Sequence, residues 1–149
     1  GTLYDGMPLR SYYNVDEATT QGLELSAKLN QGDFSVTCAY TYTDSENNET
    51  GMNLTYVPEH SFSLTPAYTY SPYGLIFSGV LSYTGKQYKD SNNTSEIDAH
   101  TVLDARIGKQ LGDWATLSFE ADNILDSDKG DDGNYRTGRA FLAKLDFSF

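Results

Sequence analysis

Residue types that perform chemistry are sparse in this sequence. The two histidines, His60 and His100, lie far apart along the chain, and neither has a nucleophile at the spacing of a catalytic pair. We expect both to be surface or interfacial residues rather than ligands or general bases. The single cysteine, Cys38, has no partner for a disulfide or a CxxC motif, so it is expected to be a small apolar residue in a strand. The sequence therefore predicts no catalytic site and a protein that is not an enzyme.

One acidic stretch, residues 126–134, is the only metal-like feature. Its carboxylates have a spacing similar to that of a calcium loop and are Asp126, Asp128, Asp131 and Asp132. The twelve-residue ligand pattern with its closing glutamate is missing. We expect a solvated loop and no metal or cofactor, with a calcium site at these four aspartates as the alternative.

The elements that would position a site are short segments with alternating polarity. In the last nine residues, Phe141, Ala143, Leu145, Phe147 and Phe149 would share one face of a strand, and polar residues would share the other. Eight segments are strand-like: around Pro8 to Asn14, Gly22 to Leu29, Phe34 to Thr43, His60 to Tyr70, Leu75 to Thr84, Thr101 to Leu111, Ala115 to Leu125, and Phe141 to Phe149. The pattern predicts an all-β protein built from antiparallel hairpins.

Composition limits the class of protein further. The net charge of −11 argues against a nucleic-acid partner, because phosphate binding needs clustered Lys and Arg. No apolar run approaches the roughly 18 residues of a spanning helix. Twelve Tyr and seven Phe favour a membrane interface, since a tyrosine has an apolar ring and a polar hydroxyl. A barrel that crosses the membrane with strands would give only a weak hydropathy signal and fits these observations.

The connections between the segments alternate in length. Turns of roughly four residues follow the second, fourth and sixth segments, whereas loops of roughly ten to sixteen follow the third, fifth and seventh, as in outer-membrane barrels with long extracellular loops. This places the C-terminus in the periplasm. Tyrosines would form one ring at the loop ends (Tyr40, Tyr42, Tyr83) and another at the turn ends (Tyr68, Tyr70, Tyr73). Pro66 lacks a ladder donor inside its segment, so we expect a bulge or a kink there.

Several stretches together resemble the C-terminal portion of TonB-dependent outer-membrane receptors. Tyr13-Asn14 followed by Gly22-Leu23-Glu24 resembles the N…G-x-E hairpin of the family, and Val57-Pro58-Glu59-His60 resembles its P-x-H strand entry. Tyr83-Thr84-Gly85 with Tyr88 resembles the Y-x-G…Y exit. The closing run is the most specific: Asp122-Asn123-Ile124-Leu125-Asp126, Tyr135, Gly138-Arg139-Ala140-Phe141 and the terminal Phe149.

The resemblance implies a transmembrane, antiparallel, up-and-down barrel of 22 strands around a plug, which imports ferric siderophores, cobalamin or similar scarce ligands. The chain holds no candidate for the plug or the TonB box, so we expect residues 1–149 to be a single barrel segment. Its partners would be outer-membrane lipid, the outer-membrane assembly machinery, the missing plug, TonB and a metal chelate. Two alternatives stay open: a complete, closed eight-stranded outer-membrane barrel with a structural or adhesive role, and a soluble all-β binding module.

Further residues receive roles from this interpretation. The polar faces of the last three segments would present six charged residues to the lumen: Asp104, Arg106, Glu120, Asp122, Lys144 and Asp146. Across a narrow closed lumen Arg106 could pair with Glu120, and Lys144 with Asp122, whereas in a wide barrel the same residues would face a plug or water. Aromatic and cationic residues in the long loops suit an anionic metal chelate, and the candidates are Tyr88, Lys89, Tyr135 and Arg136. The terminal aromatic and its alternating partners, Phe141, Phe147 and Phe149, resemble the signal that the assembly machinery reads by strand addition.

Overall fold

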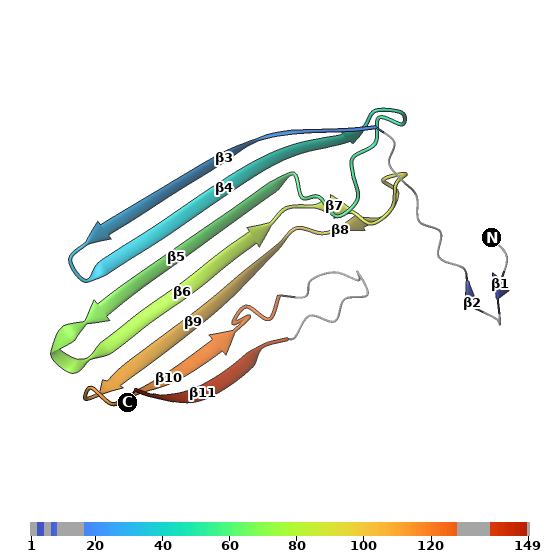
Figure 1. Ribbon diagram of the computed structural model, residues 1–149. Helices are drawn as coiled ribbons and strands as arrows, with labels where there is room; N and C mark the ends of the chain where they lie inside the picture. The colour runs from blue at the N-terminus through green and yellow to red at the C-terminus, as the bar shows by residue number, and fades with distance from the viewer. Residues whose placement is uncertain (1–2, 5–6, 9–16, 128–137, 149) are drawn as a thin grey trace.

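The computed structural model describes residues 3–4, 7–8, 17–127 and 138–148 (Figure 1). Its strands are β1 (Leu3–Tyr4), β2 (Met7–Pro8), β3 (Ala18–Gln31), β4 (Phe34–Asn47), β5 (His60–Tyr70), β6 (Leu75–Thr84), β7 (Gln87–Tyr88), β8 (Glu96–Ile97), β9 (His100–Leu111), β10 (Ala115–Asp122) and β11 (Ala140–Phe147). One 3-10 turn, η1 (Ser71–Tyr73), joins β5 to β6. Among the described residues no helix has the length and apolar character needed to cross a membrane.

Seven strands form one antiparallel sheet in which each strand pairs with the next along the main meander. The order is β11-β10-β9-β6-β5-β4-β3, while β7 and β8 form a small hairpin within the β6–β9 connection. The all-β antiparallel prediction is confirmed. The sheet is open, because β3 and β11 are its two edges in the described part of the chain, so the closed eight-stranded barrel is not what forms. The segment predicted around Pro8 to Asn14 lies outside the described residues, apart from Pro8.

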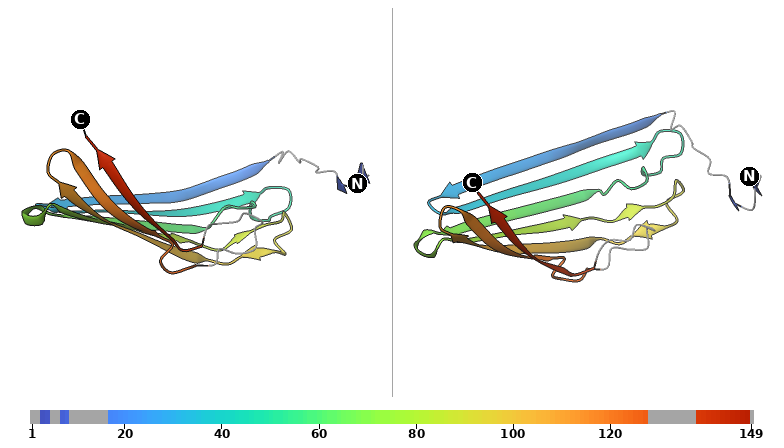
Figure 2. Two further views of the ribbon diagram at one scale, coloured as in Figure 1. Left: turned by 90° about the horizontal axis from the view of Figure 1, so that it is seen from below. Right: turned by 60° about the horizontal axis from the view of Figure 1, so that its bottom comes forward.

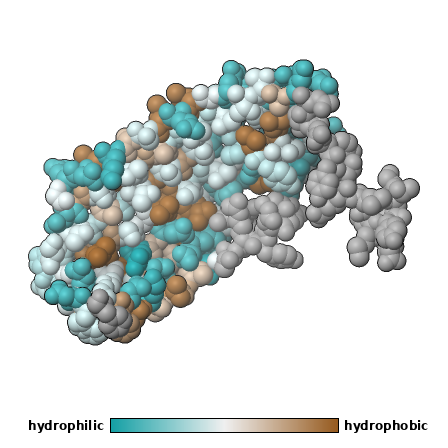
Figure 3. All heavy atoms as spheres, viewed as in Figure 1, coloured by the Kyte–Doolittle hydropathy of each residue, from teal (hydrophilic) through white to brown (hydrophobic). Residues whose placement is uncertain are grey.

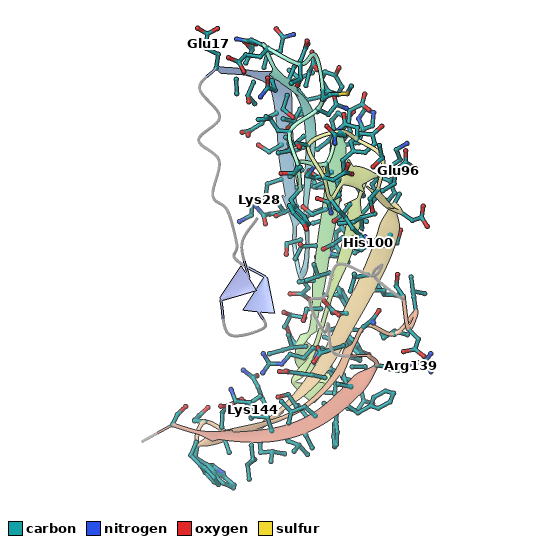
Figure 4. The ribbon with its side chains drawn as sticks, turned by 90° about the vertical axis from the view of Figure 1, so that its right-hand side faces the viewer. Glu17, Lys28, Glu96, His100, Arg139 and Lys144 are labelled. Atoms are coloured by element: carbon teal, nitrogen blue, oxygen red, sulfur yellow. The ribbon has the colours of Figure 1, made fainter. Side chains whose placement is uncertain are left out.

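The sheet curves, so that it has a convex and a concave face (Figure 2). Side-chain alternation assigns the apolar set to the convex face, and the register keeps this set together across all seven strands, for example at Leu25↔Tyr40 and Phe77↔Ile107. Figure 4 shows Lys28 and Lys144 on the concave side. The concave face, which Figure 3 views, is mostly pale and teal with separate brown patches. The predicted two-faced strands are therefore confirmed.

The sheet is a single layer without an enclosed core. Only Ile97 and Ala115 are buried hydrophobic residues in the described ranges. Several large apolar residues of the convex face stay more than half exposed, among them Leu25 at 56% and Phe119 at 54%. A soluble β-sandwich would bury these residues against a second sheet, so the soluble binding module is not supported by this architecture. A continuous apolar face of this size marks a surface that a lipid bilayer or another apolar partner covers.

Strand boundaries depart from the sequence prediction at several ends. β4 continues to Asn47, beyond the predicted end at Thr43, because the antiparallel partner β3 is equally long and pairs Ala18 with Asn47. β10 stops at Asp122 rather than Leu125, because Asn123 has a φ of 49° and leaves the extended region.

A bulge, one of the two distortions predicted at Pro66, does not form. Pairing of β5 with β4 runs through Val36↔Pro66 without a shift in register. On the other side the same register resumes after a gap, from Leu64↔Leu81 to Ala67↔Ser78, so no residue is inserted. The proline interrupts only the ladder toward β6, because a proline has no backbone N–H to donate to the neighbouring strand. Its ring instead packs over Gly79, where an added Cβ would lie 3.9 Å from Pro66 Cγ.

Candidate functional site

The end of the sheet from which the long loops emerge gathers residues of three motif fragments. The Gly85 N–H donates to the His60 carbonyl at 2.7 Å, which joins the P-x-H fragment to the Y-x-G fragment. An added Cβ at Gly85 would lie 2.8 Å from that carbonyl oxygen, and one at Gly22 would lie 2.2 Å from the Tyr42 carbonyl oxygen. Glycine is therefore required at both positions because neighbouring backbone comes too close for any side chain.

His60 belongs to an aromatic cluster at this end. Its ring lies 6.1 Å from the ring of Tyr40 and 5.3 Å from that of Tyr42, between centroids. The Tyr40 hydroxyl and His60 Nδ1 share a hydrogen bond of 2.9 Å. This position agrees with the interfacial role that was predicted for His60. His100 is buried at 7% exposure, so it does not take the surface position that was one of its two predicted roles.

Two long loops, 48–59 and 85–99, are tied together by backbone and amide hydrogen bonds. The Asn93 side chain accepts from the Asn53 N–H at 2.8 Å and donates to the Asn53 carbonyl at 3.0 Å. The Tyr56 N–H donates to the Tyr88 carbonyl at 2.8 Å. Asn93 adopts a left-handed φ of 54°, which asparagine tolerates better than most residues. The two loops therefore form one surface, which we call the loop platform (residues 48–59 and 85–99).

A carboxylate organises the tip of the second loop. Asp90 accepts from the Ser95 N–H at 2.7 Å, from the Thr94 N–H at 3.2 Å and from the Thr94 hydroxyl at 2.8 Å. These donors favour the ionised carboxylate. The hydrogen bond from the Ser95 backbone, followed by the one from the Thr94 hydroxyl, lowers the pKa of Asp90 below its ordinary value.

The loop platform carries two of the four predicted ligand residues. Tyr88 and Lys89 are half-buried in it, and the Lys89 N–H donates to the Ser95 carbonyl at 2.9 Å. Lys86 Nζ lies 5.2 Å from the centre of the Tyr88 ring and 2.5 Å from Glu96 Oε1. The hydrogen bond to Glu96 raises the pKa of Lys86. Tyr135 and Arg136 lie outside the described residues.

A tight turn follows β10 and holds the start of β11. Asn123 is buried at 4% exposure, and its Oδ1 accepts from the Ser127 N–H at 3.0 Å. Its own N–H donates to Asp104 Oδ1 at 2.7 Å. Asp126 then accepts from the Arg139 N–H at 3.1 Å, with Arg139 Nη2 at 3.8 Å from its other oxygen. The D-N-I-L-D fragment is thus a structural turn that joins β9, β10 and β11.

This turn also bears on the calcium alternative. Asp126 is engaged with Arg139, and Asp128, Asp131 and Asp132 lie outside the described residues. Within the described ranges, no three His, Cys, Asp or Glu side chains are grouped so that they could hold a metal ion.

A charge cluster occupies the concave face across β9, β10 and β11. Arg106 Nε lies 3.3 Å from Glu120 Oε1, which confirms the predicted Arg106–Glu120 pair. Arg106 Nη2 donates to the fully buried Ser118 hydroxyl at 3.1 Å and lies 4.0 Å from Asp146 Oδ2. Because these side chains are partly exposed, each ion pair contributes little to stability by itself. Their shared position makes one charged patch.

The predicted pairing of Lys144 with Asp122 is wrong. Lys144 Nζ lies 2.8 Å from Asp146 Oδ1, two residues along the same face of β11. The register pairs Lys144 with Ser118 and Asp122 with Ala140, so the two charges are four residues apart along the strands. Asp104 also belongs to the predicted lumen set. Its carboxylate accepts the Asn123 N–H and so supports the turn after β10, instead of pairing with a cation.

The opposite end of the sheet, where the turns are short, carries stacked aromatic rings. Ring centroids are 6.4 Å apart for Tyr68 and Tyr70, 5.4 Å for Tyr70 and Tyr73, and 6.0 Å for Trp114 and Phe147. Two aromatic clusters at the two ends of the convex face match the predicted geometry. Within the predicted assembly signal, Phe141 is 76% exposed and Phe147 is 53% exposed, while Phe149 lies outside the described residues.

Sequence reasoning missed the roles of Asn93 and Asn123. The signal for Asn123 was present as part of the closing motif, but the motif did not reveal that its amide caps a turn. Asn93 stands in an Asn-rich loop, and nothing in its local sequence marks it as the residue that reaches Asn53, 40 positions away.

Taken together, a curved antiparallel meander with a continuous apolar convex face, a charged concave face and alternating long and short connections defines a segment of an outer-membrane barrel wall. The chain belongs to the TonB-dependent receptor family: the model described as "TonB dependent receptor-like, beta-barrel" matches residues 2–124. The family comprises receptors of the Gram-negative outer membrane, which are transporters rather than enzymes.

Relatives and solved structures agree with this assignment. The chain is 31% identical over 132 residues to the ferrioxamine receptor of Yersinia enterocolitica, covering 80% of this chain and 18% of that protein. It is 29% identical over 115 residues to the vitamin B12 transporter BtuB of Photobacterium profundum, covering 77% and 19%. The siderophore receptor PiuA from Acinetobacter baumannii superimposes with a TM-score of 0.74 at 19% identity, covering 87% of this chain and 22% of that chain. The chain thus spans about a fifth of the length of the curated relatives it matches.

Proposed function

We propose that this chain supplies barrel wall and extracellular loops to a TonB-dependent importer of a scarce metal chelate, such as a ferric siderophore. The observation that carries the proposal is the loop platform, in which two loops are joined by the Asn93–Asn53 hydrogen bonds and present aromatic and cationic side chains together. Relatives named for ferrioxamine, vitamin B12 and metal-pseudopaline support a chelated metal as the ligand class.

The chemistry of the platform suits such a ligand. Metal chelates of this kind are bulky and carry anionic oxygen groups, so they are bound by aromatic faces and by charge-assisted hydrogen bonds. Tyr88 and Lys89 are our ligand-contact candidates on the platform, with Tyr135 and Arg136 on the third long loop. Lys86 forms an ion pair with Glu96, and its amino group over the Tyr88 ring helps to hold that ring in place.

In this arrangement the long loops are extracellular, and the short turns and the C-terminus are periplasmic. The convex face contacts outer-membrane lipid. The concave face is the lumen side, so its charged residues face the plug that such a receptor carries, and TonB engages the receptor from the periplasm. Residues 1–149 then act as one wall segment. Phe141, Phe147 and Phe149 serve the outer-membrane assembly machinery as the strand-addition signal.

Uptake by cells that express the intact receptor tests this function. We would measure binding and accumulation of a panel of labelled ferric hydroxamates, ferric catecholates and cobalamin, with and without TonB. We expect TonB-dependent accumulation of one class. Tyr88→Ala should weaken its binding by about tenfold, through the loss of roughly one ring contact. Tyr73→Ala, which removes an exposed tyrosine at the turn end, is the matched control and should bind normally.

Two results would count against the proposal. If accumulation of every compound in the panel were independent of TonB, the chain would not belong to an energised importer. If Tyr73→Ala weakened binding as much as Tyr88→Ala, the loop platform would not be the ligand surface.

A further inference from the structure

The convex face is not smooth, because a groove of about 770 Å³ crosses it. The groove exists because small residues lie side by side: Gly79 pairs with Ala105, and Ala105 pairs with Ala121. The next row of the sheet is large, with Phe77 opposite Ile107 and Ile107 opposite Phe119, and forms one wall. The groove is therefore determined by the sequence of three strands in register, β6, β9 and β10, and not by a loop.

The groove runs across the strands from β4 to β11. It begins at Phe34 and Tyr68, near the short turns, and ends at Phe141, where β11 leaves the third long loop. Its floor is the backbone between the two rows, and its walls are almost entirely apolar. The volume is in the range of about 300–1,000 Å³ that is typical of small-molecule pockets. An elongated apolar group fits this shape better than a compact polar ligand.

A cation lies on β9 next to the large wall of the groove, on the side of that wall that faces the short turns. Lys109 is the single Lys or Arg among convex-face positions of the seven described sheet strands, and it follows Ile107 by two residues on the same face. It is half-buried, and its amino group donates to the Tyr73 carbonyl. A lysine at the edge of an apolar band extends its charge toward the membrane surface. There it is placed to meet a lipid phosphate.

We propose that the groove holds an acyl chain of a phospholipid of the periplasmic leaflet, with the lipid phosphate at Lys109. The inference rests on the orientation given under the proposed function, which makes the turn end periplasmic. The groove is continuous with the lipid-facing wall, so acyl chains are already at its rim. A chain lying in it contacts protein on several sides rather than one, and gains dispersion contacts that a smooth wall does not offer.

Matched substitutions test the two halves of the site. Ala105→Leu fills the groove, whereas Ala27→Leu adds the same side chain to another exposed alanine of the convex face on β3. Lys109→Gln removes the charge and keeps a donor for Tyr73, and Lys28→Gln is its control on the concave face. The intact receptor, purified in detergent, would be titrated with dioleoyl phosphatidylglycerol, and native mass spectrometry would give the lipid-bound fraction. We expect Ala105→Leu and Lys109→Gln each to weaken retention about tenfold, and both controls to retain lipid as the parent does.

Equal retention by all four variants would overturn the proposal, as would a parent that binds detergent but no phospholipid. Receptor dimers that disappear with Ala105→Leu, without any bound lipid, would assign the groove to a second copy and also overturn it. Chelate binding measured on the same samples tests the proposed function independently of the lipid groove. Loss of lipid with chelate binding intact supports the groove alone, and groove-specific lipid retention without chelate binding would refute only the proposed function.

Discussion

At the turn end of the sheet each hairpin is closed by residues that are neighbours in sequence, whereas the loop end is held by contacts between segments far apart. The short turns use left-handed glycines, with φ of 57° at Gly32, 59° at Gly74 and 68° at Gly112. At the loop end, Gly85 meets His60 and Asn93 meets Asn53. The structure of the turn end is therefore determined by local backbone conformation, whereas the structure of the loop end is determined by tertiary contacts. This difference predicts that equivalent substitutions will have unequal effects at the two ends.

The largest difference is expected between glycines. Gly22→Ala or Gly85→Ala should destabilise the folded barrel by about 3 kcal/mol or prevent assembly, because the new Cβ would overlap the backbone of the neighbouring segment. Gly32→Ala should cost about 1 kcal/mol, since its φ of 57° is strained for alanine but nothing lies within 4 Å of an added Cβ. Urea unfolding in detergent, followed by unheated gel electrophoresis, measures both. Equal losses of stability for the loop-end and turn-end variants would contradict the proposed difference between the two ends.

Next in size is the Asn123 turn. Asn123→Ala should destabilise by about 2 kcal/mol, because the Ser127 N–H loses its acceptor in a buried site and alanine is strained at a φ of 49°. Asn123→Asp is the control, since it keeps the Oδ1 acceptor. The same unfolding assay applies, and a stable alanine variant would show that β11 is positioned without this turn.

A smaller and more local effect is expected at the loop platform. Asn93→Ala should raise amide hydrogen exchange in both residues 48–59 and 85–99 by about fivefold to tenfold, because loss of about 1 kcal/mol of hydrogen bonding releases each loop. The exposed neighbour Asn92, changed to alanine, should leave exchange unaltered. Faster exchange confined to one loop would mean that the platform is not a unit.

The smallest effect concerns pH. Asp90 has a lowered pKa in the folded loop, so its stabilising contribution is complete above its ordinary pKa of 3.8 and is lost as pH falls through the lowered value. Amide exchange at Ser95 should therefore stay constant from neutral pH to about pH 4, after correction for intrinsic rates, and accelerate below it. In Asp90→Ala the exchange should be fast throughout. A parent protein with no acid-dependent step would contradict the assignment.

Much of the wall could be predicted from the sequence, because strand alternation is a local property. Leu23, Leu25 and Leu29 indicate their common face without any knowledge of their neighbours. The sequence also placed the short turns, the aromatic clusters at the two ends and the family motifs. Arg106 and Glu120 were predicted as a possible pair from their opposite charges on neighbouring strands, and the short turn between β9 and β10 gives a register that brings them together.

Predictions failed where they depended on register or on contacts across loops. Lys144 and Asp122 have opposite charges on adjacent strands, yet the hairpin from β10 to β11 contains a long loop, and its length does not set the register. A bulge or a kink was expected at Pro66, but no residue is inserted there, and Gly79 on β6 leaves room for the proline ring. A surface or interfacial position was expected for His100, and its burial excludes the surface position because burial depends on which residues other segments cover.

The sequence by itself determined that the chain forms two-faced antiparallel strands with one lipid-like face, and its motifs determined the family. Those properties follow from the chemistry of residues one to four positions apart. Only the tertiary structure decided which loops meet, which cation pairs with which carboxylate, and that Gly79, Ala105 and Ala121 align into a groove. Each of these depends on the relative shift of strands, and that shift is set by the sum of many weak contacts along the whole sheet rather than by any single residue.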